Sequence, residues 1–168
     1  MGEVETDALG RVLPHEHIAS VYGHWNTGRQ NSQPNPAWEE EILNHYQPIL
    51  TRLRQEYDCR TLVEVSPSYG FRQGRDLEVW AELSRRTGVN IVVCTGYYTE
   101  RIRPENFGDL SVTQVADTMI REACEGIAGT NVRAGIIKAA LDRWTADSRK
   151  LLKAAAVAQR ETGLSITT

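Results

Sequence analysis

Short apolar runs alternate with amphipathic segments along the whole chain, and this alternation limits the possible folds more than any other feature. The runs are continuous in apolar character, as buried parallel strands are, whereas the intervening segments repeat apolar residues at helical spacing. Strict alternation predicts an α/β domain in which helical crossovers join parallel strands. The predicted strands cover residues 10–15, 61–65, 89–95, 133–138 and 164–168, and the predicted helices cover residues 37–57, 76–87, 111–126 and 145–162.

Several helix ends carry recognisable signals. Ser111 followed by Gln114 is a capping-box pattern, and Asp76 is a suitable first-turn cap for the second helix. Gly88 and Gly163 follow the last periodic residues of their helices, where glycine favours termination. Leu77, Trp80 and Leu83 are expected on the inward face of the second helix. The apolar residues that recur at helical spacing in the first helix are Trp38, Ile42, Tyr46, Ile49, Leu50 and Leu53.

Two architectures fit this order of elements, an open doubly wound sheet and a (β/α)₈ TIM-type barrel. The segment 70–74 lacks the spacing of a glycine-rich phosphate turn, which weakly favours the barrel. A complete barrel needs roughly 250 residues. In the barrel, residues 1–168 would be the N-terminal part of a single domain, with about its first five strands and four helices.

Composition excludes several classes of partner. A net charge of −3 provides no basic surface for nucleic acid or for a membrane. No apolar stretch approaches the roughly 18 residues of a spanning helix, and the N-terminus has no secretory core. Cys59, Cys94 and Cys124 have neither disulfide nor metal-site spacing, so we expect reduced cysteines and a cytoplasmic location.

Lys138 is the most unusual residue, because it lies inside the apolar run 134–140. The chain has only two other lysines, Lys150 and Lys153, and both fall on a polar helix. A buried ammonium group is unfavourable unless it is paired or neutralised. Three interpretations are open: a lysine whose head reaches solvent, a Schiff-base lysine, or a lysine converted by carbon dioxide to an anionic carbamate ligand.

His15 and His17 are the second candidate feature. Residues two apart in a strand share a face, so both imidazoles can bind one ion. An isolated pair of this kind is more often satisfied by ordinary hydrogen bonds. In a barrel, however, this pair and Lys138 would both end strands on the rim where active sites lie. Two nearby histidines are useful to a carbamate and not to a Schiff base, which favours a metal site.

Five motifs in order carry a family resemblance: LGRVLPHEH at 9–17, GRD at 74–76, TGYY at 95–98, AGIIKAA at 134–140 and TGLSITT at 162–168. Together they resemble the phosphotriesterase-like branch of the amidohydrolase superfamily. The similarity is collinear over essentially the whole chain. It implies a (β/α)₈ barrel with two divalent metal ions, usually zinc.

The resemblance also implies roles for individual residues. His15 and His17 would bind the more buried ion, and Lys138 would bridge both ions as its carbamate. A metal-bound hydroxide would attack a phosphoester, a lactone or a carboxylester. Tyr98 would line the substrate pocket, although a rim aromatic with its hydroxyl in water is an equal alternative. The family's remaining metal ligands follow the position of Thr168, so these residues alone are expected to be inactive.

Two other functions remain open. The first is a truncated, non-catalytic product that associates as a homodimer through the open edges of the barrel. The second is a Schiff-base aldolase that uses Lys138. For the leading hypothesis the expected partner is a small-molecule ester or lactone, with no nucleic acid and no membrane. The four tryptophans are expected in packing roles, and His24 and His45 are expected outside the site.

Overall fold

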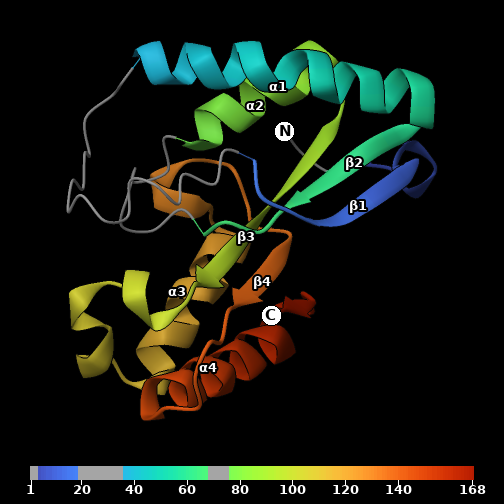
Figure 1. Ribbon diagram of the computed structural model, residues 1–168. Coiled ribbons are helices and arrows are strands. Elements are labelled where there is room, and N and C mark those ends of the chain that lie inside the picture. Colours follow the sequence, from blue (N-terminus) through green and yellow to red (C-terminus); the bar gives the residue numbers. More distant parts are fainter. Residues whose placement is uncertain (1–3, 19–35, 68–75) are drawn as a thin grey trace.

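The computed structural model describes residues 4–18, 36–67 and 76–168, which form a curved parallel sheet with helices on its outer side (Figure 1). The strand order is β1-β2-β3-β4-β5, so each strand pairs with the next one in sequence. A doubly wound sheet reverses its strand order at a switch point, whereas a barrel adds its strands in sequence. The described residues are therefore a half-barrel, as predicted. The strands are β1 Arg11–Glu16, β2 Cys59–Glu64, β3 Asn90–Tyr97, β4 Ile136–Ala139 and β5 Ile166–Thr167.

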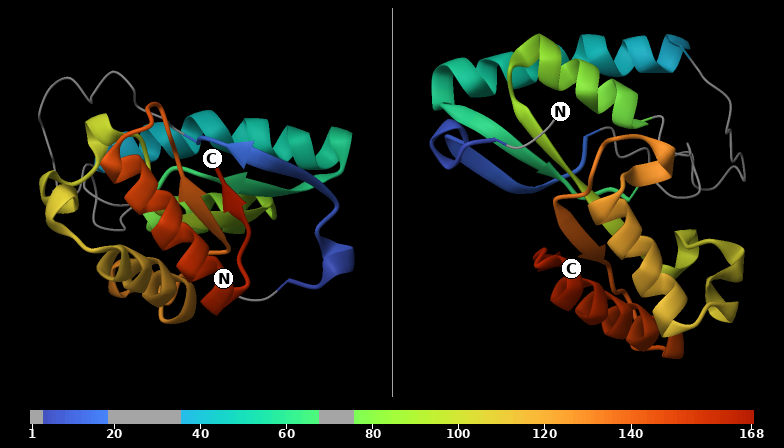
Figure 2. Two further views of the ribbon diagram at one scale, coloured as in Figure 1. Left: turned by 90° about the horizontal axis from the view of Figure 1, so that it is seen from below. Right: turned by 180° about the vertical axis from the view of Figure 1, so that it is seen from behind.

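Four α-helices connect successive strands: α1 Pro36–Tyr57, α2 Asp76–Thr87, α3 Val112–Cys124 and α4 Ala146–Thr162. In Figures 1 and 2, α1 and α2 lie side by side over one half of the sheet, and α3 and α4 cover the other half. Among the described residues there are also short 3₁₀ helices at Thr6–Ala8, Glu100–Ile102, Glu105–Asp109 and Ile127–Gly129, which the sequence pattern did not predict.

The predicted helix signals are confirmed where they can be observed. The Gln114 backbone nitrogen donates to Ser111 Oγ at 3.2 Å, and the Ser111 backbone nitrogen donates to Gln114 Oε1 at 2.9 Å. Gly163 ends α4 with φ of 75°, a left-handed conformation that suits glycine. The side chain of Asp76 and the segment 68–75 lie outside the described residues.

Two hydrophobic clusters fill the space between sheet and helices. One lies under α1 and α2, and includes Leu77, Trp80 and Leu83 at 2, 4 and 0% exposure, as predicted. The other joins α3 and α4 to the outer side of β3 and β4. Among the periodic residues of α1, Leu50 fills the core, whereas the neighbouring Ile49 is 43% exposed.

Strand boundaries differ from the predicted ones by a few residues. β4 begins at Ile136 instead of Arg133, because the Ala134 nitrogen donates to the Glu122 carbonyl of α3 at 3.0 Å. β3 continues to Tyr97, since its last two residues pair with Lys138 and Ala139 of β4. Local composition does not reveal these limits, which depend on partners distant in sequence.

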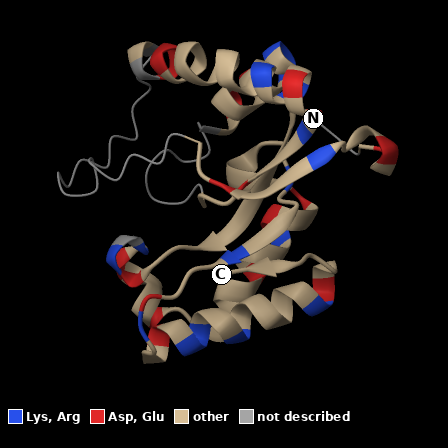
Figure 3. Cartoon of the chain, turned by 45° about the vertical axis from the view of Figure 1, so that its right-hand side comes forward, with Lys and Arg blue, Asp and Glu red and all other residues tan. Residues whose placement is uncertain are grey.

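The other expectations from composition concern the cysteines, membrane-spanning helices and surface charge. The three cysteines are free, with Cys59 and Cys94 buried. No helix in the described ranges combines the length and the apolar character needed to cross a membrane. Acidic and basic residues are interspersed over the outer helices in Figure 3, as in the pairing of Glu82 with Arg85 and Arg86.

A candidate metal centre at the ends of the strands

His15 and His17 lie at the end of β1, where the sequence placed them. Their ring centroids are 5.6 Å apart, with an interplanar angle of 72°. His15 is exposed and His17 is half-buried. The imidazoles are thus neighbours at the carboxyl end of the first strand, and both can reach one small ligand.

Lys138 comes to this pair from the fourth strand. Its side chain is 3% exposed, and its Nζ lies 3.3 Å from Nε2 of His15. The two residues are 123 positions apart in sequence, so the curvature of the sheet brings them together. The sheet curls so far that β5 also reaches β1 at this point (Figure 2), where Thr167 Oγ1 lies 3.0 Å from Nδ1 of His15.

The pKa values of His15, His17 and Lys138 are all shifted in the direction that favours the neutral form. Burial lowers the pKa of Lys138, and the nearby Cys94 opposes this shift. Desolvation, followed by the charge of Lys138, lowers the pKa of both His15 and His17. Neutral imidazole is the form that binds metals, and a neutral amine is the form that reacts with carbon dioxide. Within the described residues no ion pair compensates the charge of Lys138.

Tyr98, at the end of β3, lies against the same cluster. Its ring is 5.9 Å from that of His17 in an edge-on arrangement, and Lys138 Nζ lies 5.6 Å from the ring centroid. Arg103 links the segments that follow β3 and β4. Its Nε donates to the Tyr98 carbonyl at 2.8 Å, and its Nη2 donates to the Ala140 carbonyl at 3.1 Å. The loops after β3 and β4 are therefore tied together beside Lys138.

Two hydroxyl groups that the sequence analysis missed contact the histidines. Ser66 Oγ lies 2.8 Å from Nδ1 of His17, and Thr167 makes the contact with His15 described above. Both residues lie at carboxyl ends of strands, which is the one sequence signal that could have indicated them. Serine and threonine are too common at such positions for that signal to be specific.

A buried carboxylate supports this arrangement and was also missed. Glu64 ends β2 and is 1% exposed. Its Oε1 accepts a hydrogen bond from the Ser66 nitrogen at 2.8 Å, and its Oε2 accepts one from the Ile18 nitrogen. Glu64 therefore joins the segments that follow β1 and β2. A charged residue within the apolar run 61–65 is the same kind of signal that identified Lys138.

The centre differs from an ordinary metal site in its residue types. No group of three or more His, Cys, Asp or Glu side chains with metal-binding geometry occurs in the described part of the chain. His15, His17 and Lys138 would complete a three-ligand set only with lysine in an anionic, oxygen-bearing form. His24 and Trp25 lie outside the described residues, and the ring of His45 contacts that of Tyr46 edge-on, with centroids 4.9 Å apart.

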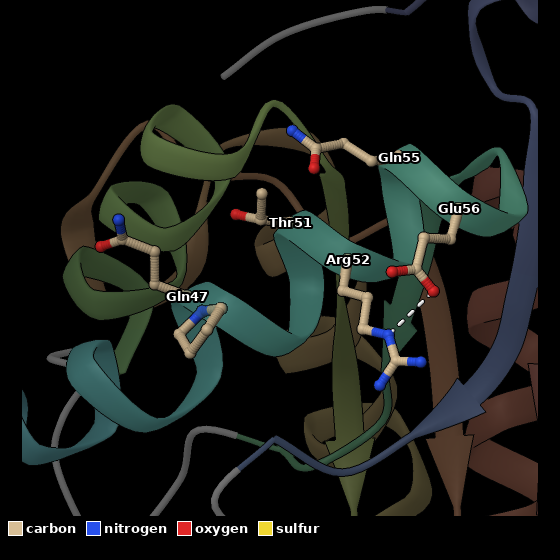
Figure 4. A pocket seen from close by; sticks show the side chains of 6 residues that line it. Gln47, Thr51, Arg52, Gln55 and Glu56 are labelled. Carbon is tan, nitrogen blue, oxygen red and sulfur yellow. Dashed lines mark hydrogen bonds and ion pairs between the residues drawn. The ribbon is translucent and has the colours of Figure 1, made fainter.

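A separate depression lies on α1 and shares no residue with this centre (Figure 4). Arg52 and Glu56 form an ion pair across one helical turn there, with Nε and Oε2 2.9 Å apart. Exposed pairs of this kind contribute little to stability. The lining residues are Gln47, Pro48, Thr51, Arg52, Gln55 and Glu56.

Comparisons with known proteins agree on one family. The profile of the phosphotriesterase family matches residues 1–168. The phosphotriesterase homology protein of Escherichia coli is 36% identical over 96% of this chain and 53% of its own length. An aryldialkylphosphatase of Saccharolobus solfataricus is 30% identical over 98% of this chain and 51% of its own length. An N-acetyltaurine hydrolase of Tetraodon nigroviridis is 27% identical over 99% of this chain and 54% of its own length.

Solved structures give the same result. The E. coli phosphotriesterase homology protein, crystallised with phosphate in its active site, matches with a TM-score of 0.72 at 30% identity, over 95% of this chain and 52% of that one. A triple mutant of an organophosphorus hydrolase from Deinococcus radiodurans matches with a TM-score of 0.76 at 30% identity, over 98% of this chain and 50% of that one. This chain thus spans about half the length of the relatives it matches.

Proposed function

Since the chain belongs to the phosphotriesterase family, we propose that its protein is a metal-dependent hydrolase in which His15, His17 and Lys138 bind divalent ions. Residues 1–168 are then the N-terminal part of a single barrel domain. The observation that carries the proposal is the 3.3 Å approach of the buried Lys138 to His15. We further propose zinc as the metal and the cytoplasm as the location, as expected from the sequence.

The burial of Lys138 argues against two other interpretations of this residue. A lysine that reaches solvent would expose its ammonium group, whereas this side chain is 3% exposed. A Schiff-base lysine does not require a pair of imidazoles, whereas here His15 lies 3.3 Å from Nζ with His17 beside it. A carbamate on the same nitrogen would place anionic oxygens next to two neutral imidazoles, which is a favourable ligand set for zinc.

The chain's own residues would each contribute a distinct function. A bound pair of divalent ions lowers the pKa of water and polarises the bond to be cleaved. His15 and His17 would fix the position of one ion from β1, and Lys138 would supply negative charge from β4. Tyr98 would form one wall of the substrate site, because its ring already packs against His17 at 5.9 Å.

The names of the relatives bear on the substrate class. One relative is named for an aryl dialkyl phosphate and another for N-acetyltaurine, which contains an amide bond. We propose that the substrate is a small molecule with a phosphoester, carboxylester, lactone or acyl-amide bond. The last of these widens the range that the sequence analysis considered.

A second candidate function is a non-catalytic product that forms a homodimer through the sheet edges. Its supporting observation is that β1 and β5, the outer strands of the described sheet, expose Val12 at 42% and Ile166 at 38%. Exposed apolar edge strands favour pairing between chains. The intact mass of the native protein separates the two candidates, because a mass near 18.9 kDa corresponds to this chain alone.

Removal and return of metal tests the hydrolase proposal. The protein from its natural source is assayed with an aryl dialkyl phosphate, an aryl ester, a lactone and an N-acyl amine, before and after treatment with a chelator. We expect hydrolysis of at least one substrate to disappear with the metal, and to return when zinc, cobalt or manganese is added. Hydrolysis that persists in protein shown by elemental analysis to be metal-free would contradict the proposal.

A further inference from the structure

Each imidazole has two nitrogens, and a metal can bind only the one that carries no hydrogen. The hydrogen-bond partner of the other nitrogen therefore decides which nitrogen is available. We infer that Thr167 and Ser66 are positioning residues, which hold Nδ1 of His15 and of His17 and leave Nε2 of each ring for the ligand. This inference rests on the proposed metal site.

The contacts of His15 assign its tautomer. In its ammonium form Lys138 can only donate, and Nε2 of His15 is then the acceptor across their 3.3 Å separation. The hydrogen of the neutral ring is then on Nδ1, which donates to Thr167 Oγ1 at 3.0 Å. When Lys138 no longer donates a hydrogen bond, Nε2 of His15 keeps a lone pair that points toward Lys138 Nζ.

The strand register explains why Thr167 can do this. Thr167 of β5 is the direct partner of Lys138 of β4 in the parallel ladder. Partners in a ladder project to the same side of the sheet. The two side chains therefore approach His15 together, one at each of its nitrogens.

His17 is held from β2 by a longer chain of contacts. Ser66 Oγ lies 2.8 Å from Nδ1, and the Ser66 backbone is fixed by the buried Glu64 at 2.8 Å. Glu64 also accepts from the nitrogen of Ile18, the residue that follows His17. The backbone on both sides of this contact is thus hydrogen-bonded to one carboxylate, which holds the segments of His17 and Ser66 together.

The first measurement needs no metal. Nitrogen NMR of the imidazoles in the metal-free protein, at a pH well above their pKa, reports which nitrogen carries hydrogen. We expect His15 to be protonated at Nδ1 in the wild type and in Thr167→Ser, and to become a mixture of tautomers in the isosteric Thr167→Val. A wild-type His15 protonated at Nε2, or a Thr167→Val spectrum identical to that of the wild type, would overturn the inference.

The second measurement is zinc affinity by competition with a chelating dye. Loss of a partner of this kind typically weakens metal binding by about 10–100-fold, which we expect for Thr167→Val and for Ser66→Ala. Thr167→Ser should restore wild-type affinity, and Thr113→Val, at an exposed position of α3, should leave it unchanged. Equal affinity of Thr167→Val and wild type would overturn the inference. A wild type with the Nδ1 tautomer and no zinc binding would contradict the proposed function and leave the tautomer assignment standing.

Discussion

Replacement of Lys138 by methionine is expected to abolish metal-dependent hydrolysis while the protein remains folded. Methionine keeps the apolar stem and removes the nitrogen, so the proposed anionic ligand cannot form. Loss of several kcal/mol of transition-state stabilisation corresponds to on the order of 10³-fold or more in kcat/KM. Stability should not fall, because burial lowers the pKa of Lys138 and the folded state therefore disfavours its charged form.

The matched control for this variant is Lys153→Met, which removes a lysine from an exposed position of α4. It should retain wild-type activity and metal content. The carbamate is tested separately by ¹³C NMR after equilibration with ¹³C-labelled bicarbonate, where the wild type should show a carbamate carbon that Lys138→Met lacks. An active, metal-loaded Lys138→Met protein would remove Lys138 from the proposed site.

Replacement of Glu64 by alanine is expected to produce the largest loss of stability among the residues around the site. The variant leaves the buried nitrogen of Ile18 and the partly buried nitrogen of Ser66 without their acceptor. Hydrogen bonds to a charged group contribute about 1.5–3 kcal/mol each, so the loss should be roughly 3 kcal/mol or more. Chemical denaturation of the full-length protein should show this as a lower midpoint.

Two further variants separate the role of Glu64 from a general effect of removing a carboxylate. Glu64→Gln should lie between the wild type and the alanine variant, because one of the two acceptor oxygens is retained. Glu82→Ala removes a glutamate whose partners Arg85 and Arg86 are on the surface of α2, and its midpoint should stay close to that of the wild type. A Glu64→Ala midpoint equal to that of Glu82→Ala would refute the structural role of Glu64.

The fold was largely predictable from sequence because the signals that define it are local. Apolar runs, helical spacing and the Ser111–Gln114 capping box each depend on residues close together in the chain. The choice of a barrel over a doubly wound sheet came from the family resemblance, and the approach of Lys138 to His15 then followed from strands that end at a common rim. A charged residue in an apolar run was informative for the same reason, since burial restricts which groups can be there.

The supporting contacts were not predictable, because they depend on strand register and on the curvature of the sheet. Thr167 reaches His15 only because β5 pairs with β4 at Lys138 and the sheet curls back to β1. Nothing in the local sequence distinguishes Thr167 from the adjacent Thr168. Similarly, Ser66 contacts His17 because Glu64 connects the ends of two strands.

The proposed metal centre is tested most directly by crystallography of the metal-loaded, full-length protein at the absorption edge of zinc. Anomalous density is expected about 2.0–2.1 Å from Nε2 of His15 and of His17. Extra density on Lys138 Nζ should extend toward the metal as a carbamate. An unmodified Lys138 with no anomalous peak beside the histidines, in crystals grown with excess zinc and bicarbonate, would contradict the account.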